Sequence, residues 1–240
     1  MYDGEFWSNA DSLMQLYDVG MSSMFTMEAA ALAELADAIG RPEGPMLRKR
    51  AESMRVLIAA HLWDETGRIF TNRFSNGSFY RRISPTSFYA LLANASTNAQ
   101  AELMMTHWMM NRTRFCVTPN GDMAGNDPHR CYWGLPSISA DDAAFGKTGN
   151  DGYWRGHVWA PMVQLTYWGL QNYDGVPAVR TARKALAKQA TDMMMEQYDR
   201  HAHICENFSP NRDTADCTGD TFYSWGALAG MVSLVEAGYY

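Results

Sequence analysis

Residues 25–62 read FTMEAAALAELADAIGRPEGPMLRKRAESMRVLIAAHL, and this stretch decides the fold class. Apolar residues recur in it at helical spacing, in two runs that a polar link separates: Phe25, Ala29, Leu32, Ala36 and Ile39, then Leu47, Ala51, Met54, Leu57, Ile58 and Leu62. Gly40 and Pro42 stand in the link, which predicts that the first helix ends there. Two helices joined by so short a link form an antiparallel α-helical hairpin.

The same organisation continues along the rest of the chain. Helical spacing predicts further helices, among them those that begin near residues 85, 98, 159, 178 and 223, and we count about eight helices in all. Asn76-Gly77 lies between two runs of strand-forming residues, 68–74 and 78–83, and this arrangement predicts a β-hairpin. We therefore expect one domain over residues 1–240 that is all-α with short β-hairpin insertions: a solenoid, an open bundle or an α/α toroid.

The composition is that of a globular protein. Of the 240 residues, 47% are hydrophobic and 19% are charged, which is enough apolar material to bury a core. The net charge of −6 argues against nucleic acid as a partner, because nucleic-acid binding needs a basic surface. No apolar run reaches the roughly 18 residues that a membrane-spanning helix needs. The sequence has no phosphate-binding loop and no dinucleotide-binding glycine motif, so we expect no cofactor.

The chain has four cysteines, and no two of them are spaced as a zinc-binding pair: Cys116, Cys131, Cys205 and Cys217. We therefore expect no metal site. The even number permits two disulfides, because the pairs 116–131 and 205–217 would each close a small loop, but we favour free buried thiols. Four Asn-x-Ser/Thr sequences are potential N-glycosylation sites, and they begin at Asn76, Asn94, Asn111 and Asn207. Together with the four cysteines, they favour a secretory or extracellular location over a cytoplasmic one.

Residues 203–236 hold the strongest candidate for chemistry. Glu206 stands between a short β-like segment and a polar loop, and Tyr223 and Trp225 follow that loop. A carboxylate beside aromatic side chains suits carbohydrate chemistry; a solvated glutamate at a helix corner is an equally weighted alternative. An inverting glycosidase needs an acid and a base whose carboxyl groups lie about 6.5–9.5 Å apart. We take Glu206 as the base, and spacing singles out none of the candidate acids: Asp3, Asp18, Asp141, Asp142 and Asp151.

Trp154, Arg155 and Trp159 form a second group of candidates. The two tryptophans could stack on a sugar ring, and Arg155 could hold a substrate hydroxyl or orient a carboxylate. The alternatives are core packing for the tryptophans and a buried ion pair for the arginine. The six histidines form no catalytic pattern and are interpreted as structural; His201 and His203 would alternate along a short β-like segment.

Four segments resemble motifs of one enzyme family. YWRGHVWAPM at 153–162 resembles the Tyr-Trp-Arg-Gly-x-x-Trp motif of glycoside hydrolase family 63, which includes mannosyl-oligosaccharide glucosidase and the glucosylglycerate and mannosylglycerate hydrolases. RISPTSFY at 82–89 and GLPSISADD at 134–142 resemble two further segments of that group. ENF at 206–208, followed by FYSWG at 222–226, resembles its C-terminal end. The resemblance runs in order through essentially the whole chain.

This resemblance implies an (α/α)6 toroid and an inverting mechanism on α-linked glucosides or mannosides, so the expected partner is a carbohydrate substrate. It also implies that Glu206 is the general base. The expected substrate-binding residues are Trp154, Arg155, Trp159, Tyr223 and Trp225. Trehalases have a related toroid and are the second choice, because their corresponding motif lacks Trp-Arg-Gly.

The sequence departs from the family pattern at one point. The general acid of the family is an aspartate in an Asp-Asn-Ser-Pro type of segment, and that segment would precede residue 1 here. A complete toroid also has more helices than we count, so we expect an incomplete one. Three explanations remain: a piece of a longer enzyme, a chain that another chain completes, or a truncated non-catalytic relative that acts as a structural or sugar-binding subunit.

Overall fold

The structure is a computed structural model that describes residues 6–119, 134–146, 152–210, 217–218 and 223–239. These residues are mainly helical, which confirms the all-α prediction. They contain seven α-helices, close to the expected eight: α1 (Val19–Ala38), α2 (Gly44–His61), α3 (Tyr89–Leu92), α4 (Asn98–Met104), α5 (Ala160–Gln171), α6 (Pro177–His201) and α7 (Ala227–Glu236). Shorter turns of 3-10 or π-helix adjoin them at Pro85–Phe88, Met105–Met109, Tyr153–Arg155 and Ser224–Gly226.

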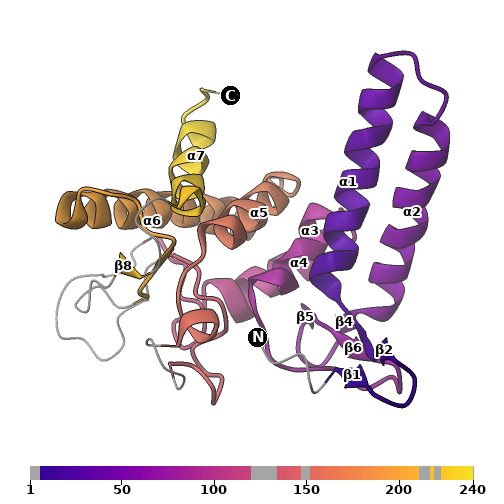
Figure 1. The fold of residues 1–240 in the computed structure, drawn as a ribbon, viewed down its shortest axis with the longest axis horizontal. Helices are drawn as coiled ribbons and strands as arrows, with labels where there is room; N and C mark the ends of the chain where they lie inside the picture. The colour runs from indigo at the N-terminus through magenta and orange to yellow at the C-terminus, as the bar shows by residue number, and fades with distance from the viewer. Residues whose placement is uncertain (1–5, 120–133, 147–151, 211–216, 219–222, 240) are drawn as a thin grey trace.

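The helices are arranged in two groups (Figure 1). Helices α1 and α2 lie side by side as the predicted hairpin, and α3 packs against both α1 and α5. Helix α5 in turn packs against α6 and α7. Helix α1 begins earlier than its apolar pattern indicated, because the Asp18 carboxylate accepts a hydrogen bond from the Met21 amide at 2.7 Å and caps the helix.

The strands form four two-stranded antiparallel pairs, each strand two residues long. The pairs are β1 (Trp7–Ser8) with β2 (Leu13–Met14), β3 (Leu16–Tyr17) with β6 (Arg73–Phe74), β4 (Trp63–Asp64) with β5 (Ile69–Phe70), and β7 (Asn207–Phe208) with β8 (Cys217–Thr218). The Asn76-Gly77 turn is confirmed: Gly77 has a φ of +90°, and the Phe74 amide donates to the Ser78 carbonyl at 2.8 Å. The run over 78–83 folds back on this strand as predicted, because Arg73 and Phe79 form an antiparallel bridge and the Tyr80 amide donates to the Asn72 carbonyl at 2.8 Å. On its other side β6 pairs with β3, which lies far away in the sequence.

The core lies around α5, which packs against α3 and against α6. Its largest fully buried side chains include Phe88, Leu91, Tyr167 and Phe208. Helix α5 links the N-terminal helices to the C-terminal ones, since it packs against α3 on one side and against α6 and α7 on the other. The segments that carry the candidate site are built against this core.

Helix α1 differs from the prediction in the face that it buries. Ala29 and Ala36 of the predicted apolar stripe are buried, whereas Phe25, Leu32 and Ile39 are exposed. The buried face of α1 also includes Thr26 and Ala33, so it is centred to one side of the predicted stripe. The large side chains of the stripe therefore lie at the exposed edge of this face.

The preference for free thiols was wrong. Cys116 and Cys205 are each disulfide-bonded, and both are completely buried. Buried thiols and buried disulfides leave the same trace in a sequence, so spacing could not separate them. Among the described residues, no helix has the length and apolar character that a membrane span requires.

Candidate active site

Backbone hydrogen bonds bring together three segments that are far apart in the sequence. The Val158 amide donates to the Phe208 carbonyl at 2.8 Å, and the Phe208 amide donates back to the Val158 carbonyl at 2.9 Å. On the other side of Val158 lies Pro136, with which it forms an isolated antiparallel bridge. Segments 134–139, 153–159 and 204–209 therefore lie side by side, and each belongs to one of the motifs found in the sequence.

Glu206 is half-buried at the edge of this arrangement, directly before β7. The Tyr153 hydroxyl donates a hydrogen bond to the Oε1 atom of Glu206 at 3.3 Å. The pKa of Tyr153 is raised, first by burial and then by the negative charge of Glu206. Tyr153 was not among the predicted site residues, although it is the first residue of the YWRG motif. Tyr153 and Glu206 are 53 positions apart in the sequence, so no local sequence pattern predicts their contact.

Tyr153 also has an uncommon backbone conformation. Its φ is +40°, in the left-handed region that residues other than glycine rarely adopt. Such conformations persist where the surrounding structure holds them, and they gather at functional sites. Here the conformation begins the 3-10 helix Tyr153–Arg155, which places Tyr153, Trp154 and Arg155 on successive sides of one tight turn.

Five aromatic rings surround this turn and form one cluster, which we call the aromatic cluster: Tyr153, Trp154, Trp159, Tyr223 and Trp225. Trp154 and Trp159 are stacked, with ring centroids 3.6 Å apart and planes 2° from parallel. Trp225 meets the edge of Trp159 at 5.8 Å and the ring of Tyr223 at 5.0 Å. The predicted aromatic site residues are therefore brought together around Tyr153, the neighbour of Glu206.

The members of the aromatic cluster differ in their exposure. Trp159 is completely buried, Trp154 and Trp225 are half-buried, and Tyr223 is exposed. In this structure Trp159 supports Trp154 from behind, while Trp154, Trp225 and Tyr223 have surface left for a ligand. Arg155 is half-buried, and its carbonyl accepts a hydrogen bond from the Gly146 amide at 2.8 Å.

A buried polar pair lies behind Glu206. The His157 Nδ1 atom and the Asn207 Oδ1 atom are 2.5 Å apart, and both residues are completely buried. This pair fixes the backbone on either side of the Val158–Phe208 bridge, in keeping with a structural interpretation of His157. The prediction for His201 and His203 was wrong in part, because His201 ends α6 and Ala202 follows it with a φ of +55°. The two rings nevertheless lie 5.8 Å apart.

Three of the candidate acids have structural partners. Asp18 caps α1, Asp141 pairs with Arg114 at 3.0 Å, and Asp142 pairs with Arg82 at 3.1 Å. Asp3 and Asp151 lie outside the described residues. The structure thus gives no reason to assign the acid to Asp18, Asp141 or Asp142.

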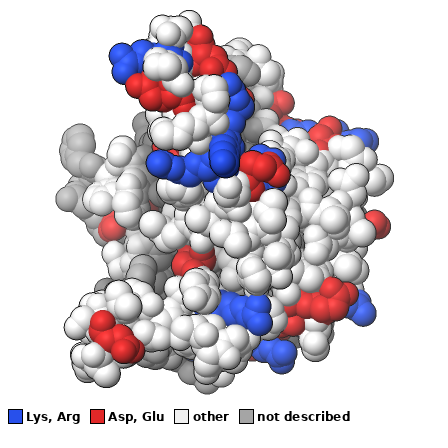
Figure 2. All heavy atoms as spheres, turned by 90° about the vertical axis from the view of Figure 1, so that its right-hand side faces the viewer, with Lys and Arg blue, Asp and Glu red and all other residues white. Residues whose placement is uncertain are grey.

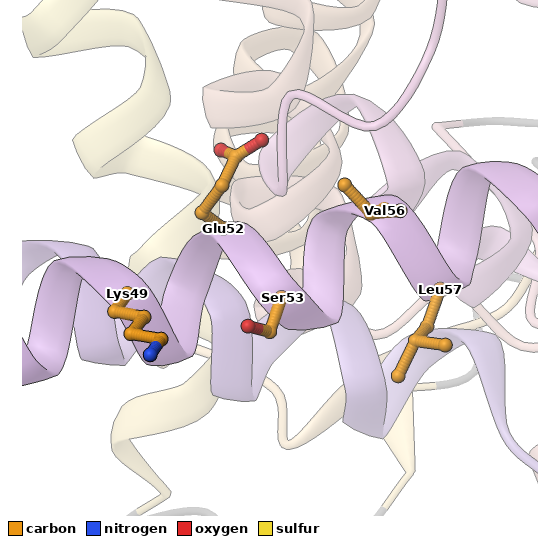
Figure 3. Close-up of a pocket in the computed structure, with 5 residues that line it drawn as sticks. All are labelled: Lys49, Glu52, Ser53, Val56 and Leu57. Atoms are coloured by element: carbon orange, nitrogen blue, oxygen red, sulfur yellow. The ribbon is translucent and has the colours of Figure 1, made fainter.

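Two hollows lie on the α1–α2 hairpin, away from the aromatic cluster. One of about 490 Å³ is on the outer side of α2 and is lined by Lys49, Glu52, Ser53, Val56 and Leu57 (Figure 3). The other, of about 610 Å³, lies at the base of the hairpin beside β6. Neither hollow is lined by Glu206 or by a tryptophan, so the case for the active site rests on contacts instead of on cavity size. No group of three or more His, Cys, Asp or Glu in the described ranges could hold a metal ion.

Solved structures share this fold. The family 63 mannosylglycerate hydrolase of Thermus thermophilus in complex with glucose is 19% identical, with a TM-score of 0.66 over 92% of this chain and 48% of its own. The same enzyme in complex with Tris and D-glycerate has a TM-score of 0.65 over 94% and 46%. The neutral trehalase of Saccharomyces cerevisiae is 16% identical, with a TM-score of 0.61 over 92% and 38%.

These similarities show that the fold is part of an α/α toroid. The chain spans about half the length of the Thermus structures that it matches, in agreement with the prediction of an incomplete toroid. No curated protein matches the sequence. The sequence profile of the mannosylglycerate hydrolase MGH1-like glycoside hydrolase domain, however, matches residues 2–226. The chain therefore belongs to the mannosylglycerate hydrolase MGH1-like glycoside hydrolase family, as its motifs indicated.

Proposed function

We propose that this chain supplies the general base and part of the sugar pocket of an inverting α-glycosidase. The observation that carries the proposal is the Glu206 carboxylate, held by the Tyr153 hydroxyl beside the aromatic cluster. The similar Thermus enzyme has been solved with glucose and with D-glycerate, which supports an α-glycoside of a small acceptor as the substrate. α,α-Trehalose is the second substrate to test, because a trehalase shares the fold.

In the proposed reaction Glu206 removes a proton from a water molecule as that water attacks the anomeric carbon. The hydrogen bond from Tyr153 orients one carboxylate oxygen and leaves the other for the water. The half-buried faces of Trp154 and Trp225 stack on the sugar, and Arg155 binds a hydroxyl group. We place the general acid before residue 1, where the family resemblance puts its Asp-Asn-Ser-Pro type of segment. The candidates that the structure describes are engaged in structural contacts: Asp18, Asp141 and Asp142.

The test replaces the proposed base in the natural protein and measures hydrolysis of α-glycosylglycerates, α-linked disaccharides and α,α-trehalose. We expect Glu206→Gln to lower kcat about 10²-fold or more, because a positioned general base contributes at least that much. The circular dichroism spectrum should stay unchanged. Proton NMR of the wild-type reaction on an α-glycosylglycerate should show the β-anomer of the released sugar first, as inversion requires. With α,α-trehalose, inversion at one anomeric carbon should release β-glucose and α-glucose in equal amounts.

The matched control is Glu102→Gln, which makes the same chemical change at an exposed position of α4. It should leave kcat unchanged. Hydrolysis by Glu206→Gln at the wild-type rate would contradict the assignment of the base. Release of the α-anomer first from an α-glycosylglycerate would contradict the inverting mechanism.

One observation favours a second candidate, a sugar-binding subunit without activity. Asp18, Asp141 and Asp142 are all held by structural partners, so the described residues assign no acid to work with Glu206. This candidate predicts that calorimetry detects binding of an α-glycoside, that Trp154→Ala weakens the binding, and that the natural protein releases no sugar from any substrate in the panel.

A further inference from the structure

The four Asn-x-Ser/Thr sequences differ in how the fold presents them. Such a sequence can accept an N-linked glycan, which is bulky and must lie at the surface of the folded protein. Asn76 and Asn94 are exposed, and Asn111 is half-buried. Asn207, in contrast, is completely buried. The folded chain therefore has room for a glycan at some of these positions and excludes it from one.

The side chain of Asn207 is used inside the protein. Its Oδ1 atom lies 2.5 Å from the Nδ1 atom of His157, and the next residue, Phe208, pairs with Val158 through two backbone hydrogen bonds. A glycan on Asn207 would have to displace His157 and open this bridge. The sequence at 207–209 should therefore stay unmodified in the folded protein, although it has the same motif as the other three.

Asn76 stands in the tight turn after β6, and its acceptor sequence reaches the solvent. Both Asn76 and Ser78 are exposed. The Asn76 Oδ1 atom accepts hydrogen bonds from the Ser78 amide at 2.9 Å and from the Ser78 hydroxyl at 2.7 Å. These bonds are local, so they hold the asparagine and the hydroxyl of the acceptor sequence together. The Nδ2 atom, on the other side of the same amide group, points away from Ser78.

The acceptor sequence at Asn94 lacks such contacts. The Ser96 hydroxyl donates to the Thr97 carbonyl at 2.9 Å, and the Ser96 amide donates to the Tyr173 hydroxyl at 3.1 Å. The middle residue, Ala95, is buried. The hydroxyl of this sequence is therefore bonded away from its asparagine, and the segment is fixed to the core.

The acceptor sequence at Asn111 repeats the local contacts but is less exposed. The Thr113 amide and hydroxyl donate to the Asn111 Oδ1 atom at 3.0 Å and 2.9 Å. The Asn111 carbonyl accepts from the Cys116 amide at 3.0 Å, and the asparagine is half-buried. Asn76 therefore combines the two features, an exposed asparagine and a hydroxyl bonded to it, that the other sequences have only in part.

The disulfides place the chain in a suitable compartment. Cys116 and Cys205 are each disulfide-bonded. Disulfides form and persist in oxidising compartments such as the lumen of the endoplasmic reticulum, and Asn-x-Ser/Thr sequences of secretory proteins are glycosylated in the same compartment. The oxidation state of the cysteines and the modification of Asn76 thus require the same surroundings.

The surface near this turn also suits a glycan. Strand β6 and the turn belong to the base of the α1–α2 hairpin (Figure 1). On the side of the hairpin, charges collect at the top, where the loop that joins α1 to α2 lies, and a broad uncharged area extends below them (Figure 2). Residues 75–78 carry no charge, and Tyr17, in the strand that pairs with β6, is 60% exposed. A glycan here would supply the solubility that charged side chains provide elsewhere.

We propose that the natural protein carries an N-linked glycan on Asn76 and none on Asn207. In the transfer reaction the Asn76 Nδ2 atom forms a bond to the anomeric carbon of an oligosaccharide. The bond between that carbon and the diphosphate of a lipid-linked donor breaks, the lipid diphosphate leaves, and a base of the transferase takes the amide proton. The proposal holds whether or not Glu206 is a general base.

Mass spectrometry of intact glycopeptides tests the proposal on the protein purified from its source cells. After reduction, trypsin places Asn76 in the peptide 74–81 and Asn207 in the peptide 201–212. We expect the first peptide to carry a glycan, with a higher occupancy than any other acceptor sequence, and the second to carry none. Intact glycopeptides are needed because the Asn76-Gly77 sequence can deamidate spontaneously, which imitates the product of enzymatic glycan removal.

An unmodified Asn76, a higher occupancy at another acceptor sequence, or a glycan on Asn207 would overturn the proposal. Three variants give the matched comparison. Ser78→Ala removes the hydroxyl of the acceptor sequence and should lower the mass of the secreted protein by one glycan, whereas Ser78→Thr keeps a hydroxyl and should retain the glycan. Ser209→Ala, in the buried sequence, should lose no glycan. A Ser78→Ala protein that keeps its glycan would also overturn the proposal.

Discussion

The Tyr153 hydroxyl and the Glu206 carboxylate are held together by independent constraints. Tyr153 is fixed by its left-handed backbone and by edge contacts with Trp154 and Trp159. Glu206 is fixed by its neighbours, since Cys205 is disulfide-bonded and Asn207 is bonded to His157. A carboxylate that is held from both sides in this way keeps its orientation without help from a ligand, which is what the proposed role as a base requires.

The coupling between these two residues can be measured in this chain without any activity. We expect Glu206→Gln to lower the pKa of Tyr153, because the substitution removes a negative charge that opposes ionisation of the phenol and keeps an oxygen that accepts its hydrogen bond. Titration of ¹³Cζ-labelled tyrosine by NMR, with Tyr153→Phe to assign the signal, gives the value. Glu196→Gln on α6 is the control. If the pKa of Tyr153 is the same in both variants, the inferred coupling between Tyr153 and Glu206 is wrong.

At the scale of elements, the start of α7 and the Glu206 segment meet at a glycine. A Cβ atom added to Gly226 would lie 2.1 Å from the Cys205 carbonyl oxygen, which is far inside normal contact. The 3-10 turn Ser224–Gly226 can approach β7 only because this position has no side chain. The turn also carries Trp225, so the same close approach brings that ring to Trp159.

The prediction is that Gly226→Ala disturbs the site and lowers the free energy of unfolding by about 1–3 kcal/mol or more, because the added methyl group must push two backbones apart. Gly175→Ala is the matched control: nothing lies within 4 Å of its Cβ position. There the substitution should raise the free energy of unfolding by about 0.4–1 kcal/mol, because it restricts the unfolded chain. Urea unfolding followed by circular dichroism compares the two, and equal effects would contradict the packing argument.

How far the sequence predicts these elements depends on the range of the interactions. The hairpin of α1 and α2 was predictable because Gly40 and Pro42 act locally, and the Asn76-Gly77 turn for the same reason. The pairing of β6 with β3 was not, since it depends on where distant chain segments meet. In the site, Glu206 and the tryptophans stand out by residue type, whereas the Tyr153–Glu206 contact depends on folding over 53 positions.

At the scale of the whole molecule, a polar network ties three helices together. The Tyr167 hydroxyl of α5 donates to the Glu236 carboxylate of α7 at 2.6 Å, and Arg183 of α6 pairs with the same carboxylate. Burial is the main reason that the pKa of Tyr167 rises to about 12, and the hydrogen bond and charge of Glu236 add to it. The neutral phenol is therefore favoured in the folded state.

This network predicts an alkaline limit to stability. A tyrosine in the unfolded chain ionises near pH 10, whereas Tyr167 in the folded chain ionises near 12, so its contribution is complete below about pH 10 and is lost as the pH rises toward 12. Tyr167→Phe should cost about 1–3 kcal/mol at pH 8, because it removes a hydrogen bond to a charged group. It should also reduce the loss of stability between pH 10 and 12.

Urea unfolding at pH 8, 10, 11 and 12 tests this prediction. Tyr198→Phe, at an exposed position of α6, is the control and should behave as the wild type does. An alkaline loss that is equally steep in wild type and Tyr167→Phe would show that the network does not set the limit.

The bridge between Val158 and Phe208 also has a consequence for the order in which the chain folds. It joins positions 50 apart, and α5 and α6 make up most of the chain between them. Closing so long a loop in a flexible chain has a large entropic cost, but two helices that have already packed as a hairpin bring its ends together. The site should consequently assemble late, once α5 and α6 have formed. The raised pKa of Tyr153, which depends on its burial and on its contact with Glu206, would then appear only in the last step of folding.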